Sequence, residues 1–296
     1  MPELPEVQTT INGLRKKVLE RIFFDVETDI SQKIRCFVGG RNKGFPEFKK
    51  QIRHKRVKAV RRAGKNIILD LSQGWSLLIH QKMTGHLLYG KWRKDRNRWQ
   101  AQTKGAVQQD PMNRFIHLVL KLNNGYQLAL SDVRKFAKIE LWPTRDLADS
   151  KEMKALGPDA LSAELTPSLF KKLLLKKKGK IKQILMDQTV IAGIGNIYSD
   201  EILFRAKVHP QRSAQSLSNA DFKKTHQAMR VILKKAIQLR GTSSSDYRDI
   251  NGKKGAFVKL LKVYRRAGQK CPKCQGIIKR LKIGGRSAHY CPNCQK

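Results

Sequence analysis

A change in the spacing of apolar residues near Pro143 is the feature that most limits the folds open to this chain. Before it, short apolar and β-branched runs alternate with turn signals, as in antiparallel β-structure. The runs are residues 58–62, 67–71, 76–80, 116–122, 126–130 and 138–142. Turn signals include Gln73-Gly74 after one run and Asn123-Asn124-Gly125 between two others. We expect a meander of strands that builds a β-sandwich.

Helical spacing marks the start of the chain and its second half. Pro5 suits a helix start, and Val7, Ile11, Leu14 and Val18 then fall on one face. In the second half, helices are predicted at residues 167–178, 180–188, 196–205 and, after a Ser218 cap, 219–239. The fold class is therefore α+β with more than one domain.

Two polar segments follow neither period and are predicted loops. Residues 91–113 are polar and basic, and we expect a mobile surface loop there. Residues 241–255, with the sequence GTSSSDYRDINGKKG, are rich in Gly, Ser and Asp, so an exposed loop is expected.

The charge of the chain indicates a polyanionic partner. The 296 residues include 62 Lys and Arg against 23 Asp and Glu, a formal net charge of +39. This balance favours nucleic-acid binding over an ordinary metabolic enzyme. The 40% of hydrophobic residues excludes a disordered basic tail. No apolar run approaches the roughly 18 residues of a membrane span, and no secretory signal is evident, so a cytoplasmic protein is expected.

Four of the five cysteines lie in the last 26 residues in a pattern typical of zinc sites. Cys271 and Cys274 form one CxxC knuckle, and Cys291 and Cys294 form a second one sixteen residues later. Four thiolates complete a tetrahedral zinc site, so the predicted ion is structural. Basic side chains between the knuckles, Arg280, Lys282 and Arg286, suit a hairpin that contacts phosphates; the first two are equally compatible with solvated charges.

The N-terminus offers a second chemical pattern, Pro2 followed by Glu3 and Glu6. Removal of Met1 would expose a secondary amine. An α-amino group has a pKa of about 7.7–8.0, against about 10.4 for lysine, so far more of it is neutral near pH 7. A neutral amine attacks an electrophilic sugar carbon, and a nearby carboxyl group moves protons. A plain helix start with acidic residues near its dipole explains the same residues.

Several motifs together resemble the bacterial formamidopyrimidine-DNA glycosylase family. They are MPELPEV at the N-terminus, Arg62-Ala-Gly-Lys65, His80-Gln-Lys-Met83-Thr-Gly85, residues 182–201 (KQILMDQTVIAGIGNIYSDE) and the four-cysteine tail. Leu4 is similar to the formamidopyrimidine branch, whereas the related endonuclease VIII branch usually has Gly there. The resemblance implies an N-terminal β-sandwich with its leading helix, a helix-two-turn-helix domain and a C-terminal four-cysteine zinc finger.

The resemblance also implies roles for individual residues. Pro2 is the expected Schiff-base nucleophile, Glu3 the acid-base group at the sugar, and Glu6 a support for both. Lys65 is the expected proton donor in β-elimination. Arg286 is expected to bind the phosphates that flank the lesion and to assist δ-elimination, since its planar fork holds a phosphate and stays protonated.

The resemblance also implies that a wedge of three side chains and the neighbouring Lys135 contact DNA. Met83, Arg134 and Phe136 match a wedge that fills the space left by the extruded nucleotide. Without the motifs around them, Met83 and Phe136 would be expected in the hydrophobic core. Lys135 replaces the second arginine of the usual Pro-Arg-Arg-Phe, which keeps the cation but loses its bidentate geometry.

The remaining predicted DNA contacts are Lys178, Lys182 and Asn196. Asn196 follows Gly193-Ile-Gly195 and starts a predicted helix, whose N–H groups suit a phosphate. A helix start without a ligand is the alternative for Asn196, and solvated charges are the alternative for the two lysines. Phe115 stands where the family often has a DNA-contacting histidine, with His117 two residues later.

We therefore expect a bifunctional glycosylase and AP lyase of base excision repair, which excises 8-oxoguanine and formamidopyrimidines and then performs β,δ-elimination. The alternatives are an oxidised-pyrimidine glycosylase of the same fold, a noncatalytic damaged-DNA-binding protein, and an RNA-binding or ribosome-associated zinc protein.

The expected partner is double-stranded DNA with oxidised bases or abasic sites, bound by a monomer at the bacterial nucleoid. The expected cofactor is one structural Zn²⁺. The expected domains are residues 1–145, 146–262 and 263–296.

Overall fold

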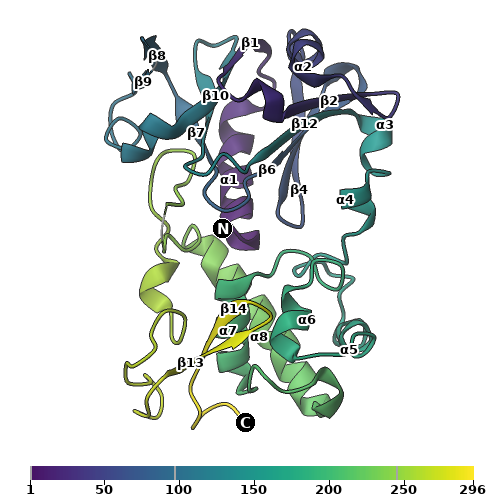
Figure 1. Cartoon of the computed structure of the whole chain (residues 1–296), viewed down its shortest axis with the longest axis vertical. Helices are drawn as coiled ribbons and strands as arrows, with labels where there is room; N and C mark the ends of the chain where they lie inside the picture. Colours follow the sequence, from purple (N-terminus) through teal and green to yellow (C-terminus); the bar gives the residue numbers. More distant parts are fainter. Residues whose placement is uncertain (1, 97, 245) are drawn as a thin grey trace. The chain divides into compact units, whose positions relative to one another are not determined.

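The computed structural model describes residues 2–96, 98–244 and 246–296, and its elements are labelled in Figure 1. Met1, which must be removed to expose the Pro2 amine, lies outside these residues. The described chain groups into two compact units, one of residues up to Lys154 with Arg240–Ala256, the other of Ala155–Leu239 with Phe257–Lys296. The three-part domain division stays a prediction. No helix in the described part of the chain is long and apolar enough to cross a membrane.

The first unit is built from two β-sheets and a leading helix. Its helices are α1 (Leu4–Val18), α2 (Gly44–Ile52), α3 (Thr144–Leu147) and α4 (Lys151–Lys154). Its strands are β1 (Phe23–Thr28), β2 (Ile34–Val38), β3 (Arg41–Asn42), β4 (Val57–Ala63), β5 (Asn66–Leu71), β6 (Trp75–His80), β7 (His86–Gly90), β8 (Trp92–Asp95), β9 (Arg98–Ala101), β10 (Ile116–Leu122), β11 (Gln127–Ser131) and β12 (Lys138–Pro143). Short 3₁₀ turns lie at Ser31–Lys33, Ser72–Gly74 and Pro111–Phe115.

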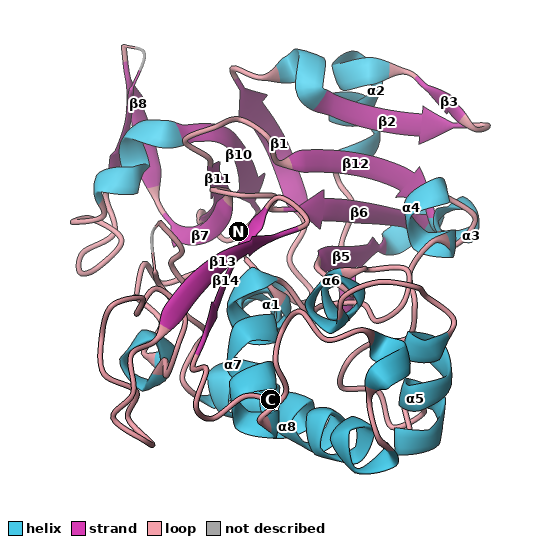
Figure 2. Cartoon of the chain, turned by 60° about the horizontal axis from the view of Figure 1, so that its bottom comes forward, coloured by secondary structure: helices cyan, strands magenta, loops and turns pink. Residues whose placement is uncertain are grey.

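The two sheets share one apolar core, which confirms the predicted sandwich. One sheet has the order β1-β10-β11-β7 and the other β3-β2-β12-β6-β5-β4 (Figure 2). Buried side chains of both sheets join the apolar face of α1 in a single cluster. The predicted single meander is wrong, because β10 and β11 belong to one sheet whereas β12 runs between β6 and β2 of the other. Splitting the strands lets both sheets bury an apolar face against each other.

Residues 91–113 are not the loop that their polarity predicts. They include the β8–β9 hairpin, followed by the 3₁₀ turn at Pro111–Phe115. Trp92 and Val107 are 4% exposed and pack in a small second core with Val119. The Trp92 indole N–H donates to Asn113 Oδ1 over 3.0 Å. Two buried apolar residues, Trp92 and Val107, are too few to create a visible period in a basic segment, so the sequence pattern does not reveal them.

The predicted loop at residues 241–255 has no helix or strand in its described part, residues 241–244 and 246–255, but much of that part is buried. Tyr247 and Ile250 are 7% and 1% exposed, and Tyr89 N donates to Ile250 O over 2.7 Å. A Cβ on Gly13 of α1 would lie 2.7 Å from Ile250 Cγ1, so glycine there lets this loop pack on the helix. The expectation of an exposed loop is wrong for these residues.

The second unit is mainly helical, as its spacing predicts. It contains α5 (Pro167–Leu175), α6 (Ile181–Met186), α7 (Asn196–Ala206), α8 (Asn219–Gln238), 3₁₀ turns at Ala214–Ser216 and Phe257–Leu260, and the hairpin β13 (Lys279–Ile283) and β14 (Arg286–Tyr290). The predicted Ser218 cap is confirmed: Ser218 Oγ accepts from Asp221 N over 3.1 Å, and Asp221 Oδ2 accepts from Ser218 N, a capping box.

Candidate functional site

The start of α1 brings Pro2, Glu3 and Glu6 together in a buried position. Glu3 and Glu6 are 2% and 1% exposed, and Pro2 is buried as well. Glu3 is the N-cap residue, and its N–H donates to Glu6 Oε2 over 2.8 Å within a capping box. Buried carboxyl groups are costly without partners, so this arrangement needs further donors.

The loop after α8 supplies those donors. Glu6 Oε1 accepts from Thr242 N over 2.6 Å, and the Tyr247 hydroxyl donates to Glu6 O over 3.1 Å. Burial, reinforced by Glu6, raises the pKa of Tyr247 well above its ordinary value, so this phenol stays protonated. Gly241 has a φ of +79°, and a Cβ there would lie 2.6 Å from Glu6 Oε1. Sequence reasoning missed these residues because the contacting segments are 236 positions apart.

Lys65 lies in the tight turn between β4 and β5. Ala63 pairs with Asn66 across this turn, and Gly64 has a positive φ of 56°. The Lys65 side chain is 6% exposed, so it is not the solvated lysine of a surface turn. Burial of the imidazole, together with the positive charges of Lys82 and Lys65, lowers the pKa of His80 to about 3. The neutral His80 Nδ1 accepts from Lys82 N over 2.9 Å.

Met83, Arg134 and Phe136 meet on the surface of the first unit. Met83 is 38% and Phe136 49% exposed, so neither belongs to the core. Arg134 joins them, because its Nη1 lies 2.9 Å from Met83 Sδ and its guanidinium carbon lies 4.5 Å from the Phe136 ring centroid. We call these three side chains the surface triad.

Lys135 lies between Arg134 and Phe136 in the sequence, but its ammonium group contacts Asp29. Its φ is +53°, and its Nζ lies 3.6 Å from Asp29 Oδ2. His117, the candidate substitute for the family histidine, is 8% exposed and bonds through Nδ1 to the same Asp29 oxygen over 2.9 Å. The Asp29 carboxyl group therefore contacts both the Lys135 ammonium group and the His117 imidazole.

The predicted DNA contacts of the second unit differ in exposure. Asn196 is the first residue of α7 after the Gly195 N-cap, and Lys178 is exposed beside Gly179. Lys182 is 0% exposed, and its ammonium group pairs with Asp200, also buried. The DNA contact predicted for Lys182 is therefore wrong: the motif places this lysine in the core of the unit.

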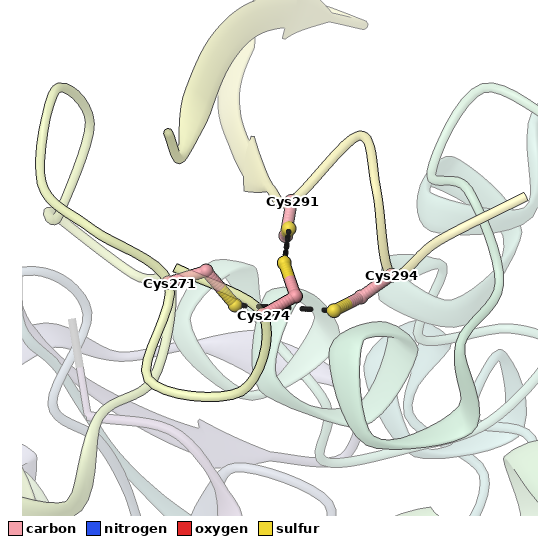
Figure 3. Close-up of side chains that lie close together, drawn as sticks. All are labelled: Cys271, Cys274, Cys291 and Cys294. Carbon is pink, nitrogen blue, oxygen red and sulfur yellow. Dashed lines mark hydrogen bonds between the residues drawn. The ribbon is translucent and has the colours of Figure 1, made fainter. Parts of the chain in front are cut away.

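The four cysteines of the tail converge, as Figure 3 shows, with their Sγ atoms all within 4.8 Å of one another. The Cys274–Cys291 and Cys271–Cys294 sulfur pairs are 3.4 and 3.9 Å apart. Tetrahedral zinc with bonds of about 2.3 Å holds its sulfurs about 3.8 Å apart, so the residues fit this ion and not disulfides. A hydrogen bond from the Gly276 N–H and the contact with Cys291 lower the pKa of Cys274 to about 7, which favours the thiolate.

The zinc site anchors the β13–β14 hairpin. Cys291 follows β14 directly, and Cys271 packs in a small core with Val263 and Ile278. Gly284 and Gly285, with φ of +53° and +75°, form the turn that pairs Ile283 with Arg286. Arg286 is exposed at the tip of the hairpin.

Comparisons with known proteins agree along the chain. Residues 1–139 match the formamidopyrimidine-DNA glycosylase N-terminal domain, residues 156–248 match the formamidopyrimidine-DNA glycosylase H2TH domain, and residues 268–296 match the zinc finger found in FPG and IleRS. The third match and the cysteine geometry confirm the predicted zinc finger with one structural zinc.

Whole-chain relatives extend these matches. The formamidopyrimidine-DNA glycosylase of Pelotomaculum thermopropionicum is 38% identical over 274 residues, which cover 93% of this chain and 91% of the relative. The protein of that name from Desulfitobacterium hafniense is 36% identical over 276 residues, covering 93% and 92%. Lactococcus lactis Fpg, solved with abasic-site DNA and with Fapy-dG-containing DNA, is 31% identical with TM-scores of 0.85 and 0.84; the alignments cover 99% of this chain in both cases and 99% and 100% of those chains. This chain therefore belongs to the formamidopyrimidine-DNA glycosylase family.

Proposed function

We propose that the protein is a bifunctional DNA glycosylase and AP lyase that removes oxidised purines, above all 8-oxoguanine and formamidopyrimidines, from duplex DNA. The observation that carries the proposal is the buried start of α1, where Pro2 adjoins two acidic residues, Glu3 and Glu6, that are 2% and 1% exposed. The names of the relatives and the Fapy-dG and abasic-site DNA of the L. lactis structures support the same substrates.

Base removal uses the Pro2 nitrogen after loss of Met1. The neutral amine attacks C1′ of the damaged nucleotide while the bond from C1′ to the base breaks. The base leaves with that electron pair and takes up a proton. Glu3 protonates the sugar ring oxygen as the ring opens, and loss of the amine proton completes an iminium between Pro2 and C1′. Glu6 supports this step because its carboxyl group accepts from Glu3 N and fixes the N-cap.

Strand cleavage follows from the iminium, which acidifies the hydrogen on C2′. Loss of that proton expels the 3′ phosphate, and a second elimination expels the 5′ phosphate. We assign proton donation during the first step to Lys65, whose side chain is 6% exposed. We assign phosphate binding during the second to Arg286, at the exposed hairpin tip.

DNA binding draws on both charge and shape. The net charge of +39 favours salt-sensitive binding to any duplex. Asn196, the first residue of α7, suits a backbone phosphate because a helix N-terminus carries a partial positive charge, and Lys178 suits one as well. The surface triad suits insertion into the stack, where it offsets part of the few kcal/mol that nucleotide extrusion costs.

Borohydride trapping tests the proposal directly. The purified protein is incubated with a duplex that carries one 8-oxoguanine opposite cytosine, because reduction converts an iminium into a covalent adduct. We expect an adduct that mass spectrometry maps to Pro2 in a chain lacking Met1. Pro2→Gly should reduce trapping strongly, whereas Pro167→Gly, at another helix start, should trap as the wild type does.

Other outcomes separate the alternatives. Trapping on a thymine-glycol duplex but not on 8-oxoguanine would favour the oxidised-pyrimidine glycosylase. Tight binding without trapping on either duplex, in a chain shown to lack Met1, would favour a damaged-DNA-binding protein without catalysis.

A further inference from the structure

The surface triad is carried by two separate turns of the first unit. Met83 lies in the turn between β6 and β7, whereas Arg134 and Phe136 lie in the turn between β11 and β12. Each turn contains a non-glycine residue with a left-handed backbone, Lys82 and Lys135, both at a φ of +53°. Such conformations persist where neighbouring contacts hold them.

A buried carboxyl group joins the two turns. Asp132 is 0% exposed, and its Oδ1 accepts from Thr84 Oγ1 over 2.5 Å and from Arg134 N over 3.2 Å. Its Oδ2 accepts from Ala137 N over 2.8 Å. The Thr84 hydroxyl in turn accepts from Arg134 N over 3.1 Å. One carboxyl group thus contacts both turns. Its donors Thr84 and Ala137 are the chain neighbours of Met83 and Phe136, and its donor Arg134 is itself a triad member.

We infer that Thr84 and Asp132 are positioning residues that lock the two turns together, so that Met83, Arg134 and Phe136 enter DNA as one preformed wedge. The inference deepens the proposed function and rests on it. Triad side chains on unlinked turns would lose conformational freedom at the moment of insertion, which weakens insertion. Hydrogen bonds to a buried carboxylate are strong enough to remove that freedom beforehand.

If Thr84 and Asp132 position the wedge, their loss should impair some substrates more than others. Extruding a paired 8-oxoguanine requires the wedge, whereas an abasic nucleotide has no base to unpair and needs it less. Loss of the Thr84 hydroxyl should therefore slow excision of 8-oxoguanine more than cleavage at a preformed abasic site. The ratio of the two rates also cancels any change in the fraction of folded protein.

The test compares Thr84→Val, which has the same shape without the hydroxyl, with Thr84→Ser, which keeps it. We expect Thr84→Val to lower the ratio of single-turnover excision to abasic-site cleavage about tenfold to a hundredfold, the range that small misplacements produce. Thr84→Ser should stay near the wild-type ratio. Asp132→Asn, which removes the charge, should also lower it.

Thr225→Val is the matched control. Thr225 is 0% exposed in α8 and donates to Asp221 O over 2.7 Å, so its replacement also deletes one buried hydroxyl hydrogen bond. It should leave the ratio unchanged. A wild-type ratio for both Thr84→Val and Asp132→Asn would overturn the positioning role alone. Absence of cleavage by the wild type on both substrates would overturn the proposed function, and this inference with it.

Discussion

At the scale of single residues, burial separates lysines that look alike in the sequence. Lys178 and Lys182 lie in the same basic stretch, yet Lys178 is exposed whereas Lys182 is 0% exposed. The Asp200 carboxyl group that pairs with Lys182 also accepts from His289 N and bonds to His289 Nδ1, both over 2.9 Å. Asp200 therefore joins α6, α7 and β14, and Lys182 completes this buried network.

Replacement of each lysine by methionine should distinguish their roles. Lys178→Met should reduce the slope of log affinity against log salt by about 0.9, because one phosphate contact is lost. Lys182→Met should leave that slope unchanged but lower the free energy of unfolding by about 3–5 kcal/mol, since it removes a partner of a buried charge. Titrations of a lesion duplex at several salt concentrations and urea unfolding measure both. A reduced salt slope for Lys182→Met would contradict its assignment to the core.

At the scale of elements, two hairpins share one turn design and differ in what they present. Gly39-Gly40 joins β2 to β3 with φ of +57° and +75°, and Gly284-Gly285 joins β13 to β14 with +53° and +75°. Two residues with positive φ form the turn that matches the twist of antiparallel strands. Only the second turn precedes a residue that we assign to phosphate binding, Arg286.

The matched pair Gly285→Val and Gly40→Val should therefore separate stability from binding. A branched side chain at positive φ strains either turn, and both variants should lose about 1–2 kcal/mol of stability. Only Gly285→Val should weaken binding of a lesion duplex, by about tenfold, because it displaces Arg286. Fluorescence anisotropy and thermal unfolding provide the measurements. Equal affinities for the two variants would exclude the hairpin tip from the DNA interface.

At the scale of the whole molecule, the second unit depends on a metal site formed by its last residues. The cysteines and the residues beside them hold the tail in place: Cys271 N donates to Gly276 O over 2.7 Å, and Gln295 Nε2 donates to Val208 O over 2.9 Å. Without an ion, four sulfur groups this close would have to share protons or separate. Zinc binding is therefore coupled to the folding of this tail.

Metal analysis should find one zinc ion per chain. Cys294→Ala should lose this zinc and lower both the unfolding temperature and the affinity for duplex DNA, because the β13–β14 hairpin loses its anchor. Cys36→Ala is the control: Cys36 is a buried cysteine in the core of the first unit, and its replacement should keep the full zinc content. Loss of zinc from Cys36→Ala, or retention by Cys294→Ala, would contradict the four-cysteine site.

The elements that the sequence predicted are those with strong local signals. The β4–β5–β6 strands, the β10–β11 hairpin and α8 with its Ser218 cap all have a clear period and clear turn or cap residues. The strands β1, β2 and β7 were missed, as was α2. These are short elements whose apolar residues are too few for a period, and their formation depends on the sheets and core that they join.

By itself, the sequence determined the α+β class and the four cysteines of the zinc site, and it supplied the residues that we propose to act on DNA, because spacing and residue type are local properties. Only the tertiary structure decided which of those residues are accessible and what holds them. It buried Lys182, brought Thr242 and Tyr247 to Glu6, and linked Thr84 to Asp132. Burial and long-range hydrogen bonds depend on segments that lie far apart in the chain, and no local pattern records which of them will meet.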